Sequence, residues 1–302
     1  MDRRWIVDRV GAETFDRLAN ELAGSELGSV LLEVMQQRAG SRTMPELLAQ
    51  YERDSFVRPA GIDLRTSNAI DADFLEAAAA FEAIELSPVT PLGTCSVVAL
   101  TDQNRVLSAL RNAEVTSDPT NVLALESALR LRKEASRAVH LATSQRVIRA
   151  QPNPKLPGFS QHFRIFVLTS AGTETKDHAF TVDTLVQHVR TMLGALDRLE
   201  THGYSFGRRR IDILATAQRA ALGDRIAGAL GELAARKPLE HAYYSSGLRY
   251  MLWVTAPNGD EIPLVDGGAF DWLAKLGSNR RAVFVASGAG AQLVALRFAK
   301  PG

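Results

Sequence analysis

The sequence predicts an α+β fold, in which an antiparallel β-sheet flanked by helices follows a helical N-terminal segment over residues 1–80. Over residues 81–302, β-branched and aromatic runs alternate with runs of helical periodicity. Two pairs of such runs are joined by turn-forming sequence, PNPKLPG at 152–158 and Asn258-Gly259. Before residue 81, apolar residues recur at spacings of three and four, which is typical of amphipathic helices.

Composition limits the classes of function. The chain has 302 residues, of which 46% are hydrophobic, so it can bury the core of one large domain or two smaller ones. Its 35 basic and 34 acidic side chains give no overall polyanion-binding signature, and a turn between elements better explains its one basic run, Arg208–Arg210. RNA is therefore not indicated as a partner by charge.

The single cysteine, Cys95, excludes a disulfide framework and a thiolate metal cluster within one chain. The start, MDRRWIVDRV, has no apolar stretch typical of a secretory signal, and no run approaches the roughly 18 apolar residues that span a bilayer. We therefore expect no membrane association, with cytoplasmic residence as the default.

Several elements are predicted from local signals. Pro45 suits the first turn of a helix, and the periodicity over 180–199 predicts a long amphipathic helix. The β-branched run that closes LSPVTPLGTCSVVAL predicts a strand, as does 113–115. Over 210–237 we expect one short strand followed by a helix.

The stretch from His140 to Gly172 predicts two antiparallel strands joined by a proline-bearing loop. This pairing places Arg149 and Phe163 on opposing strands, where a guanidinium can hold a phosphate and a ring can stack on a base. The alternative is a half-buried hairpin whose arginine extends its head group to water.

Two further pairs of side chains are ambiguous in the same way. Asp118 and Thr120 flank Pro119 at a predicted helix start, where they cap the helix; alternatively, the carboxylate points into a pocket beside the sheet. Tyr243 and Tyr244 either line a pocket with hydroxyls or form an aromatic cross-strand pair.

Paired glycines form the remaining candidates. Asp266-Gly267-Gly268 lets backbone approach a ligand while a carboxylate holds an ammonium group, although a turn into a capped helix explains the same residues. Gly288 and Gly290 lack the third glycine and the following acidic residue of a dinucleotide site, so we expect them to permit close helix packing. Six histidines show no zinc-binding spacing, and no metal site is predicted.

Taken in order, five segments resemble the catalytic core of class II aminoacyl-tRNA synthetases, closest to histidyl-tRNA synthetase and its paralogues such as the regulatory subunit of ATP phosphoribosyltransferase. The resemblance covers about residues 80–298. Its segments are EVTSDPT (114–120), VIRAQ with FSQHF (147–151 and 159–163), AYYSSGL (242–248), VDGGAFDWLAKLG (265–277) and AVFVASGAGAQLVAL (282–296).

The resemblance implies a role for each candidate. It implies that six residues contact an amino-acid-like substrate: Asp118, Thr120, Tyr243, Tyr244, Gly267 and Gly268. It implies that three others contact ATP: Arg149, Phe163 and Gln292. It also implies a homodimer formed through about residues 81–98. The core over 81–302 ends where an anticodon-binding domain would begin, so no such domain is expected.

The chain departs from the family pattern at charged positions. Gln151 stands where the family has a glutamate, and Lys155 is the only basic residue of the hairpin loop. Leu239 and Ala269 replace two arginines, and Gln292 is the nearest substitute for a third. Since adenylation needs cations that balance the triphosphate, these losses disfavour catalysis.

The leading hypothesis is therefore a catalytically silent histidyl-tRNA synthetase-like paralogue with no catalytic residue assigned, which binds a small amino-acid-like ligand or a partner enzyme as a regulatory protein. The alternative is an ATP-dependent ligase that forms an aminoacyl adenylate for a non-tRNA acceptor, with ATP as its cofactor and Arg149, Phe163 and Gln292 as its contacts. An RNA-binding accessory protein is a third hypothesis.

Overall fold

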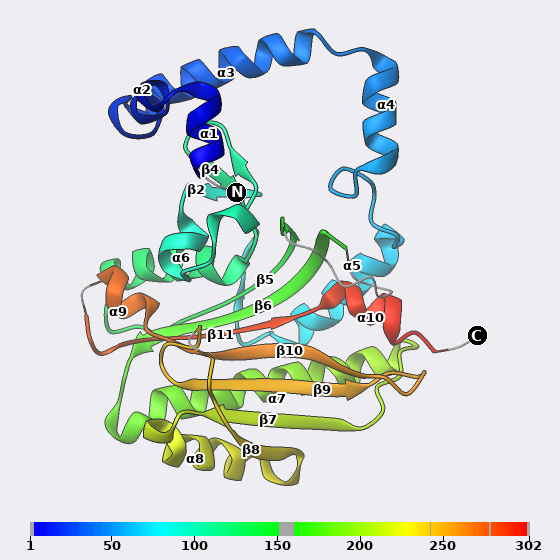
Figure 1. The fold of residues 1–302 in the computed structure, drawn as a ribbon. Coiled ribbons are helices and arrows are strands. Elements are labelled where there is room, and N and C mark those ends of the chain that lie inside the picture. Colours follow the sequence, from blue (N-terminus) through cyan, green and yellow to red (C-terminus); the bar gives the residue numbers. More distant parts are fainter. Residues whose placement is uncertain (1–2, 151–159, 242, 278, 301–302) are drawn as a thin grey trace.

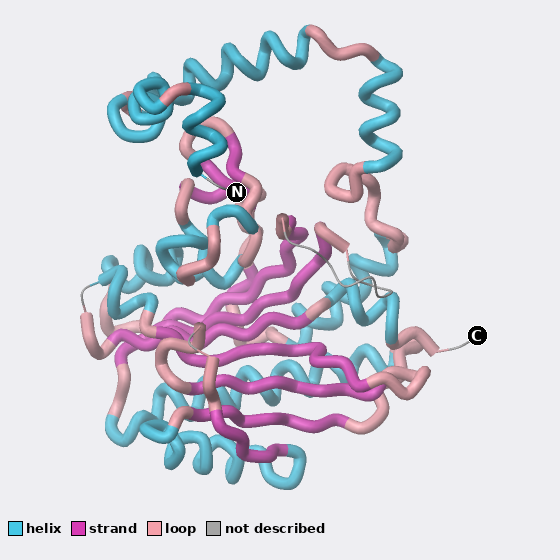
Figure 2. The backbone as a smooth tube through the Cα atoms, in the orientation of Figure 1, coloured by secondary structure: helices cyan, strands magenta, loops and turns pink. Residues whose placement is uncertain are grey.

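A large β-sheet forms the centre of the computed structural model, which describes residues 3–150, 160–241, 243–277 and 279–300 (Figure 1). The strand order is β1-β5-β6-β11-β10-β9-β7-β8, and neighbours are antiparallel except for the two edge pairs, β1–β5 and β7–β8 (Figure 2). The strands are β1 Glu82–Ala83, β5 Val139–Ile148, β6 His162–Thr173, β7 Arg209–Ala215, β8 Ala234–Pro238, β9 Leu248–Thr255, β10 Glu261–Phe270 and β11 Ala282–Ala289. The predicted fold class is confirmed.

Both predicted hairpins are present. In the β5–β6 hairpin Val147 lies opposite Phe163, and the Arg149 N–H donates to the Gln161 carbonyl at 2.8 Å. The β9–β10 hairpin turns at Asn258-Gly259, where Gly259 has a φ of 89° that favours glycine. After Pro263, which has no N–H to donate, the pairing of β10 with β9 shifts by a bulge.

Four helices cover one side of the sheet, which we call the helical face: α5 Leu64–Ala77, α7 Ala179–Thr201, α8 Ala220–Leu230 and α10 Ala291–Arg297. The main hydrophobic core lies between them and the sheet. Phe74 of α5 stacks on Phe166 of β6 with ring centroids 4.8 Å apart, and Val189, Met192 and Leu196 of α7 are fully buried. The predicted amphipathic helix over 180–199 is therefore the main support of the sheet.

The opposite side, which we call the site face, has a smaller cover. It consists of α6 Pro119–Lys133, α9 Trp272–Gly277 and a three-stranded sheet in the order β2-β4-β3, with β2 Val89–Pro91, β3 Ser108–Ala109 and β4 Ala113–Val115. A second apolar cluster packs there, in which Phe270 stacks on Trp272 at 4.1 Å. This partial cover leaves part of the sheet surface open to ligands.

The predicted strand in TCSVVAL is wrong, because Thr94–Val98 forms a helical turn, η2. The carboxylate of Glu114 accepts hydrogen bonds from the N–H groups of Gly93 at 2.8 Å and Cys95 at 2.9 Å. Because this buried carboxylate accepts from two N–H groups of the same segment, it stabilises a turn there, although β-branched residues prefer strands.

Strand β8 was not predicted, because its sequence AARKP has no β-branched or aromatic residue, and its proline is tolerated at the sheet edge. The interpretation of Arg208–Arg210 as a turn is wrong for its last two residues, which begin β7. Arg209 pairs with Asp197 and Glu200, and Arg210 pairs with Asp212 and Glu261. Two of the three arginines are therefore neutralised by neighbouring carboxylates.

The N-terminal residues are helical, as predicted: α1 Arg3–Val10, α2 Ala12–Asp16, α3 Gly24–Gly40 and α4 Met44–Arg53. Thr43 caps α4, with Glu46 returning a bond to the Thr43 N–H, and Pro45 lies in the first turn. Helices α3 and α4 form an arch that stands away from the sheet (Figure 1). The short helical turns are η1 Arg17–Glu21, η3 Gln103–Arg105, η4 Lys176–His178, η5 Ala217–Arg219 and η6 Gly231–Leu233.

No helix within the described ranges combines the length and the apolar character that crossing a bilayer requires.

A buried imidazole joins α7 to two strands of the sheet. The ring nitrogens of His188 lie 2.9 Å from the Ser170 hydroxyl and 2.8 Å from the Ser287 hydroxyl. Burial, aided by the nearby His140, lowers the pKa of His188 to about 3. The folded protein therefore keeps this imidazole neutral between about pH 6.5 and pH 3, where the unfolded chain protonates it.

This histidine should make stability depend on pH. Between about pH 6.5 and pH 3 the unfolded chain binds a proton at His188 that the folded chain does not, so the free energy of unfolding should fall as the pH drops through that window. We expect His188→Gln to flatten this part of the profile, and to cost about 1–3 kcal/mol at pH 8 because it disrupts two buried hydroxyl partners. Urea denaturation at a series of pH values measures both effects.

The control is Leu233→Ala, because the Leu233 side chain is 43% exposed and carries no titratable group, so the variant should leave the slope of the profile unchanged. A profile for His188→Gln with the wild-type slope would contradict the assignment.

Candidate functional site

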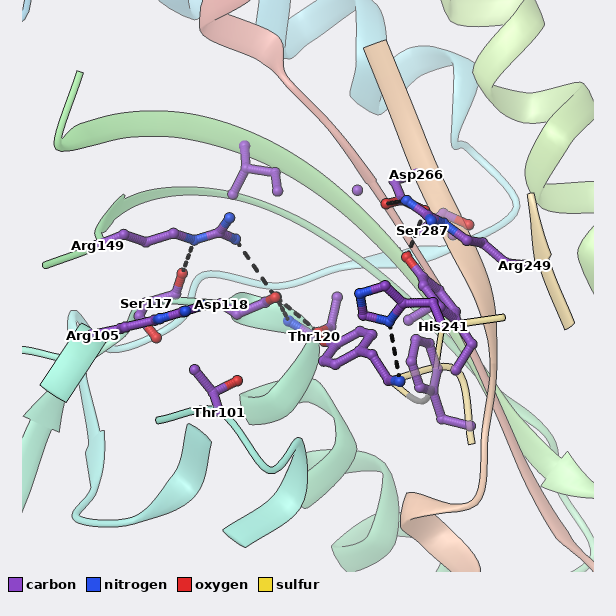
Figure 3. Close-up of a pocket in the computed structure, with 17 residues that line it drawn as sticks. Thr101, Arg105, Ser117, Asp118, Thr120, Arg149, His241, Arg249, Asp266 and Ser287 are labelled. Atoms are coloured by element: carbon purple, nitrogen blue, oxygen red, sulfur yellow. Dashed lines mark hydrogen bonds and ion pairs between the residues drawn. The ribbon is translucent and has the colours of Figure 1, made fainter. Parts of the chain in front are cut away.

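A cavity of about 400 Å³ lies on the site face, between the start of α6, the β5–β6 hairpin and strands β10 and β11 (Figure 3). Of the nine candidates from the sequence, six line its wall: Asp118, Thr120, Arg149, Tyr243, Tyr244 and Gly267. The structure thus brings together residues that are up to 149 positions apart in the chain.

Asp118 both caps α6 and faces the cavity. Its Oδ1 accepts from the N–H of Thr120 at 3.0 Å and from the Thr120 hydroxyl at 2.8 Å. Its other oxygen lies 3.6 Å from the guanidinium of Arg149, whose Nε donates to the Ser117 carbonyl at 3.0 Å. The two interpretations of Asp118, as a cap and as a pocket carboxylate, therefore describe one arrangement (Figure 3).

Phe163 supports Arg149 from the neighbouring strand. The guanidinium carbon lies 5.2 Å from the Phe163 ring centroid, a cation–π distance. Phe163 is not among the residues that line the cavity. The structure therefore brings the two side chains together on the site face, with the arginine next to the cavity and the ring beside it.

The tyrosine pair lies in the turn that precedes β9, so a cross-strand pair is the wrong interpretation. The two rings meet edge to face with centroids 5.2 Å apart, and the Tyr244 hydroxyl donates to Asp266 at 2.6 Å. Burial raises the pKa of both phenols, which therefore stay protonated at neutral pH. Within the described ranges the Tyr243 hydroxyl makes no hydrogen bond, which leaves it for a ligand.

An ion pair lies in the wall opposite Asp118. Arg249 of β9 donates to Asp266 of β10 through Nε at 3.0 Å and through a terminal nitrogen at 2.7 Å (Figure 3). Its guanidinium also lies 4.8 Å from the centroid of the Tyr244 ring. Bidentate geometry and the aromatic contact fix this arginine, so it is not a free cation.

Gly267 and Gly268 lie within β10 and not in a turn before a helix, which corrects that interpretation. A Cβ at Gly268 would lie 2.4 Å from the Leu248 carbonyl oxygen and 2.6 Å from the Tyr244 ring. A Cβ at Gly267 would lie 2.5 Å from the Tyr250 ring. Both glycines therefore let an aromatic ring approach the backbone of β10 closely, and Gly268 sets the position of Tyr244.

Gln292 is not part of the cavity. It is buried on α10, on the helical face, where its side-chain oxygen accepts from Arg146 at 3.2 Å. Gly290 precedes that helix, as the packing interpretation expects, whereas Gly288 lies in β11 and lines the cavity. Gln151 and Lys155 lie outside the described residues.

Eleven of the seventeen lining residues were not assigned to the site from the sequence, among them Arg105, Ser117, His241, Arg249 and Asp266. Arg249 had a signal, since it is a lone charge in the apolar strand LRYMLWVT. Asp266, beside the paired glycines, was considered for binding an ammonium group but was not included among the site residues. Arg105 reaches the cavity from the loop before β3, and no local pattern marks it.

Within the described ranges no group of three or more histidine, cysteine, aspartate or glutamate side chains is placed to hold a metal ion.

Solved structures share this arrangement of strands. The chain is similar to an ATP phosphoribosyltransferase regulatory subunit/histidyl-tRNA synthetase from Bacillus halodurans C with a TM-score of 0.59 and 15% identity, over 78% of this chain and 81% of that one. It matches a histidine–tRNA ligase subunit from Alicyclobacillus acidocaldarius with a TM-score of 0.58 and 14% identity, over 79% and 96%. It matches histidyl-tRNA synthetase from S. aureus with a TM-score of 0.54 and 12% identity, over 76% and 64%.

The chain has the fold of a class II aminoacyl-tRNA synthetase core. No protein-family model matches it, and no curated protein matches it in sequence.

Within this class II fold, the positions that lack the expected arginines have other uses. Leu239 and Ala269 are buried, each in a hydrophobic cluster. Neither side chain can be replaced by a guanidinium without burying a charge, which is costly unless the charge is paired. The loss of arginine at these two positions is therefore consistent with the hydrophobic packing around them.

Gly268 gives a direct test of how the cavity wall is built. We expect Gly268→Ala to lower the free energy of unfolding by about 1–3 kcal/mol or more, because the added methyl meets backbone and a buried ring. Gly228→Ala is the matched control, since a Cβ there meets nothing within 4 Å and alanine favours the helix. Equal stabilities for the two variants would contradict the close packing at Gly268.

Proposed function

We propose that the chain binds a small amino-acid-like ligand in this cavity and acts as a ligand-binding regulatory or partner-binding protein, without catalysing adenylation. The observation that carries the proposal is that two arginines of the cavity wall, Arg149 and Arg249, are already paired; we call them the inner arginines. Arg149 is engaged by the Ser117 carbonyl and Asp118, and Arg249 is engaged by Asp266. These two cations, which could otherwise bind a triphosphate, are already balanced by the protein's own acceptors.

The remaining groups suit a small zwitterion. Asp118 offers a carboxylate to an ammonium group, and the free Tyr243 hydroxyl lies in the same cavity. Arg105, the third arginine of the wall, is exposed and makes no side-chain hydrogen bond or ion pair within the described ranges. An unpaired cation and a carboxylate in one cavity match a ligand that carries both charges.

A ligand screen by thermal unfolding tests the proposal. We expect at least one amino acid or close analogue to raise the Tm, because a ligand that binds the native state alone stabilises it by about 2.7 kcal/mol at 100 times its Kd. No shift with any of the twenty amino acids or their analogues would contradict the proposal.

Two variants locate the binding. Asp118→Asn should weaken the binding of the ligand found by about 10–100-fold while preserving the helix start, since asparagine caps as well as aspartate. Arg149→Ala should weaken binding as well, and Arg65→Ala is its control because the Arg65 side chain is 94% exposed and does not line the cavity. Isothermal titration calorimetry measures all three affinities.

The alternative function is an ATP-dependent ligase that forms an aminoacyl adenylate for an acceptor other than tRNA. Arg149 with Phe163, at 5.2 Å, supports it because this pair can hold a phosphate and a base. Pyrophosphate exchange over the twenty amino acids separates the two functions. Exchange that is abolished by Arg149→Ala would establish the ligase, and we expect no exchange above background.

A further inference from the structure

A second cavity, of about 230 Å³, lies at one end of the large sheet, where β6 and β10 end and β9 and β11 begin. The starts of α7 and α9 line it, together with the turn before β9. It shares one lining residue, Phe270, with the cavity of the candidate site. We call it the end cavity. Pockets for drug-sized ligands enclose about 300–1,000 Å³, so the end cavity suits a smaller molecule.

Two arginines that line the end cavity have no acidic partner within the described ranges. Arg219 lies in η5, before α8, and Arg280 lies in the loop before β11. The Arg219 side chain is partly buried, and its guanidinium donates to the ring nitrogen Nε2 of His178 at 3.3 Å. Arg280 is exposed and makes no side-chain hydrogen bond or ion pair in the part of the chain that the structure describes. A guanidinium that is partly withdrawn from water and lacks an anion favours binding one.

The two acidic side chains that line the end cavity have partners of their own. Glu174 accepts from the N–H of Thr181 at 3.4 Å and from the Thr181 hydroxyl. Asp271 pairs with Lys275 at 2.9 Å and accepts from the Ser245 hydroxyl at 2.7 Å. Because both carboxylates are engaged in this way, the positive charge of the two arginines is available to a ligand.

Unusual backbone geometry places an imidazole in the same wall. Asp177 and His178 are consecutive residues with φ of 55° and 57°, a conformation that side chains other than glycine seldom adopt. Arg225 donates to the Asp177 carbonyl, and a Glu174 oxygen lies 3.3 Å from Nδ1 of His178. Strain of this kind persists only where the surroundings hold it, and it is concentrated at ligand-binding sites. Here it holds the imidazole beside Arg219.

We propose that the end cavity is a second binding site, which takes a phosphate group such as that of a small phosphate monoester. Its two arginines reach it from different elements, η5 and the loop before β11. One guanidinium fork satisfies a planar carboxylate, whereas a tetrahedral phosphate has oxygens for two guanidinium groups and for a hydroxyl as well. Ser246, in the wall, offers that hydroxyl, which makes no hydrogen bond within the described ranges.

Titration with inorganic phosphate tests the proposal, by calorimetry at an ionic strength held constant with sodium chloride. We expect saturable binding to the wild type, and a Kd raised about 10-fold or more by Arg219→Lys and by Arg280→Ala. Arg219→Lys keeps the charge and the stem, which packs where a Cβ at Gly247 would lie 3.0 Å from it, but removes the planar fork. Arg280→Ala changes an exposed side chain, so its fold is retained. Arg65→Ala is the matched control, because that side chain is 94% exposed and does not line the end cavity.

A further variant, Arg105→Ala, distinguishes the end cavity from the cavity of the candidate site, which Arg105 lines. We expect its Kd for phosphate to equal that of the wild type. The proposal would be overturned by an absence of saturable binding, by a Kd that Arg65→Ala or Arg105→Ala raises as much as Arg280→Ala does, or by tighter binding of malonate than of phosphate. Because the assay contains no amino acid, its result does not depend on the proposed function.

Discussion

The site depends on the contact between Asp118 and Arg149. Asp118 fixes the first turn of α6 by accepting from Thr120, and its second oxygen lies 3.6 Å from the guanidinium of Arg149 at the end of β5. One carboxylate thus sets the position of a helix relative to a hairpin. Because the Ser117 carbonyl also accepts from Arg149, the backbone before the helix is held to the same side chain.

The charges of the cavity explain why a synthetase fold need not imply synthetase chemistry. Phosphoryl and adenylyl transfer depend on cations that are free to meet developing negative charge. In this cavity Arg249 is held by two bonds to Asp266 and by the Tyr244 ring. Breaking such a pair to bind a phosphate leaves a carboxylate without its partner, which costs part of the binding energy gained. The fold therefore supplies the shape of an adenylate pocket in which the two inner arginines, Arg149 and Arg249, carry no spare positive charge.

Much of the fold was predictable because its signals are local. Asn258-Gly259 predicted its hairpin, and Asp118 with Pro119 predicted the start of α6. The helical turn after Gly93 was not predictable, because it is stabilised by the Glu114 carboxylate, 21 positions away from Gly93 in the chain. Strand β8 is formed by pairing at a sheet edge, and its own residues carry little preference for a strand.

The site was predictable in part, and for a similar reason. Motif order identified Asp118, Arg149 and the tyrosines, but a motif does not report on which side of the sheet a helix residue lies. Gln292 therefore appeared equivalent to a cavity residue, although α10 packs on the helical face. Arg249 was not predicted as a site residue because the family motifs do not include it. A single charge in an apolar strand nevertheless indicates a paired or functional side chain.

Direct measurement of ATP affinity tests the central claim, that the cavity's two inner arginines, Arg149 and Arg249, are already balanced by its own carboxylates and carbonyl. Equilibrium dialysis of ATP with magnesium against the wild-type chain, with and without the amino acid that stabilises it, gives this affinity. The account predicts binding weaker than about 1 mM, which corresponds to about 4 kcal/mol. Micromolar binding that is lost in Arg149→Ala would contradict it.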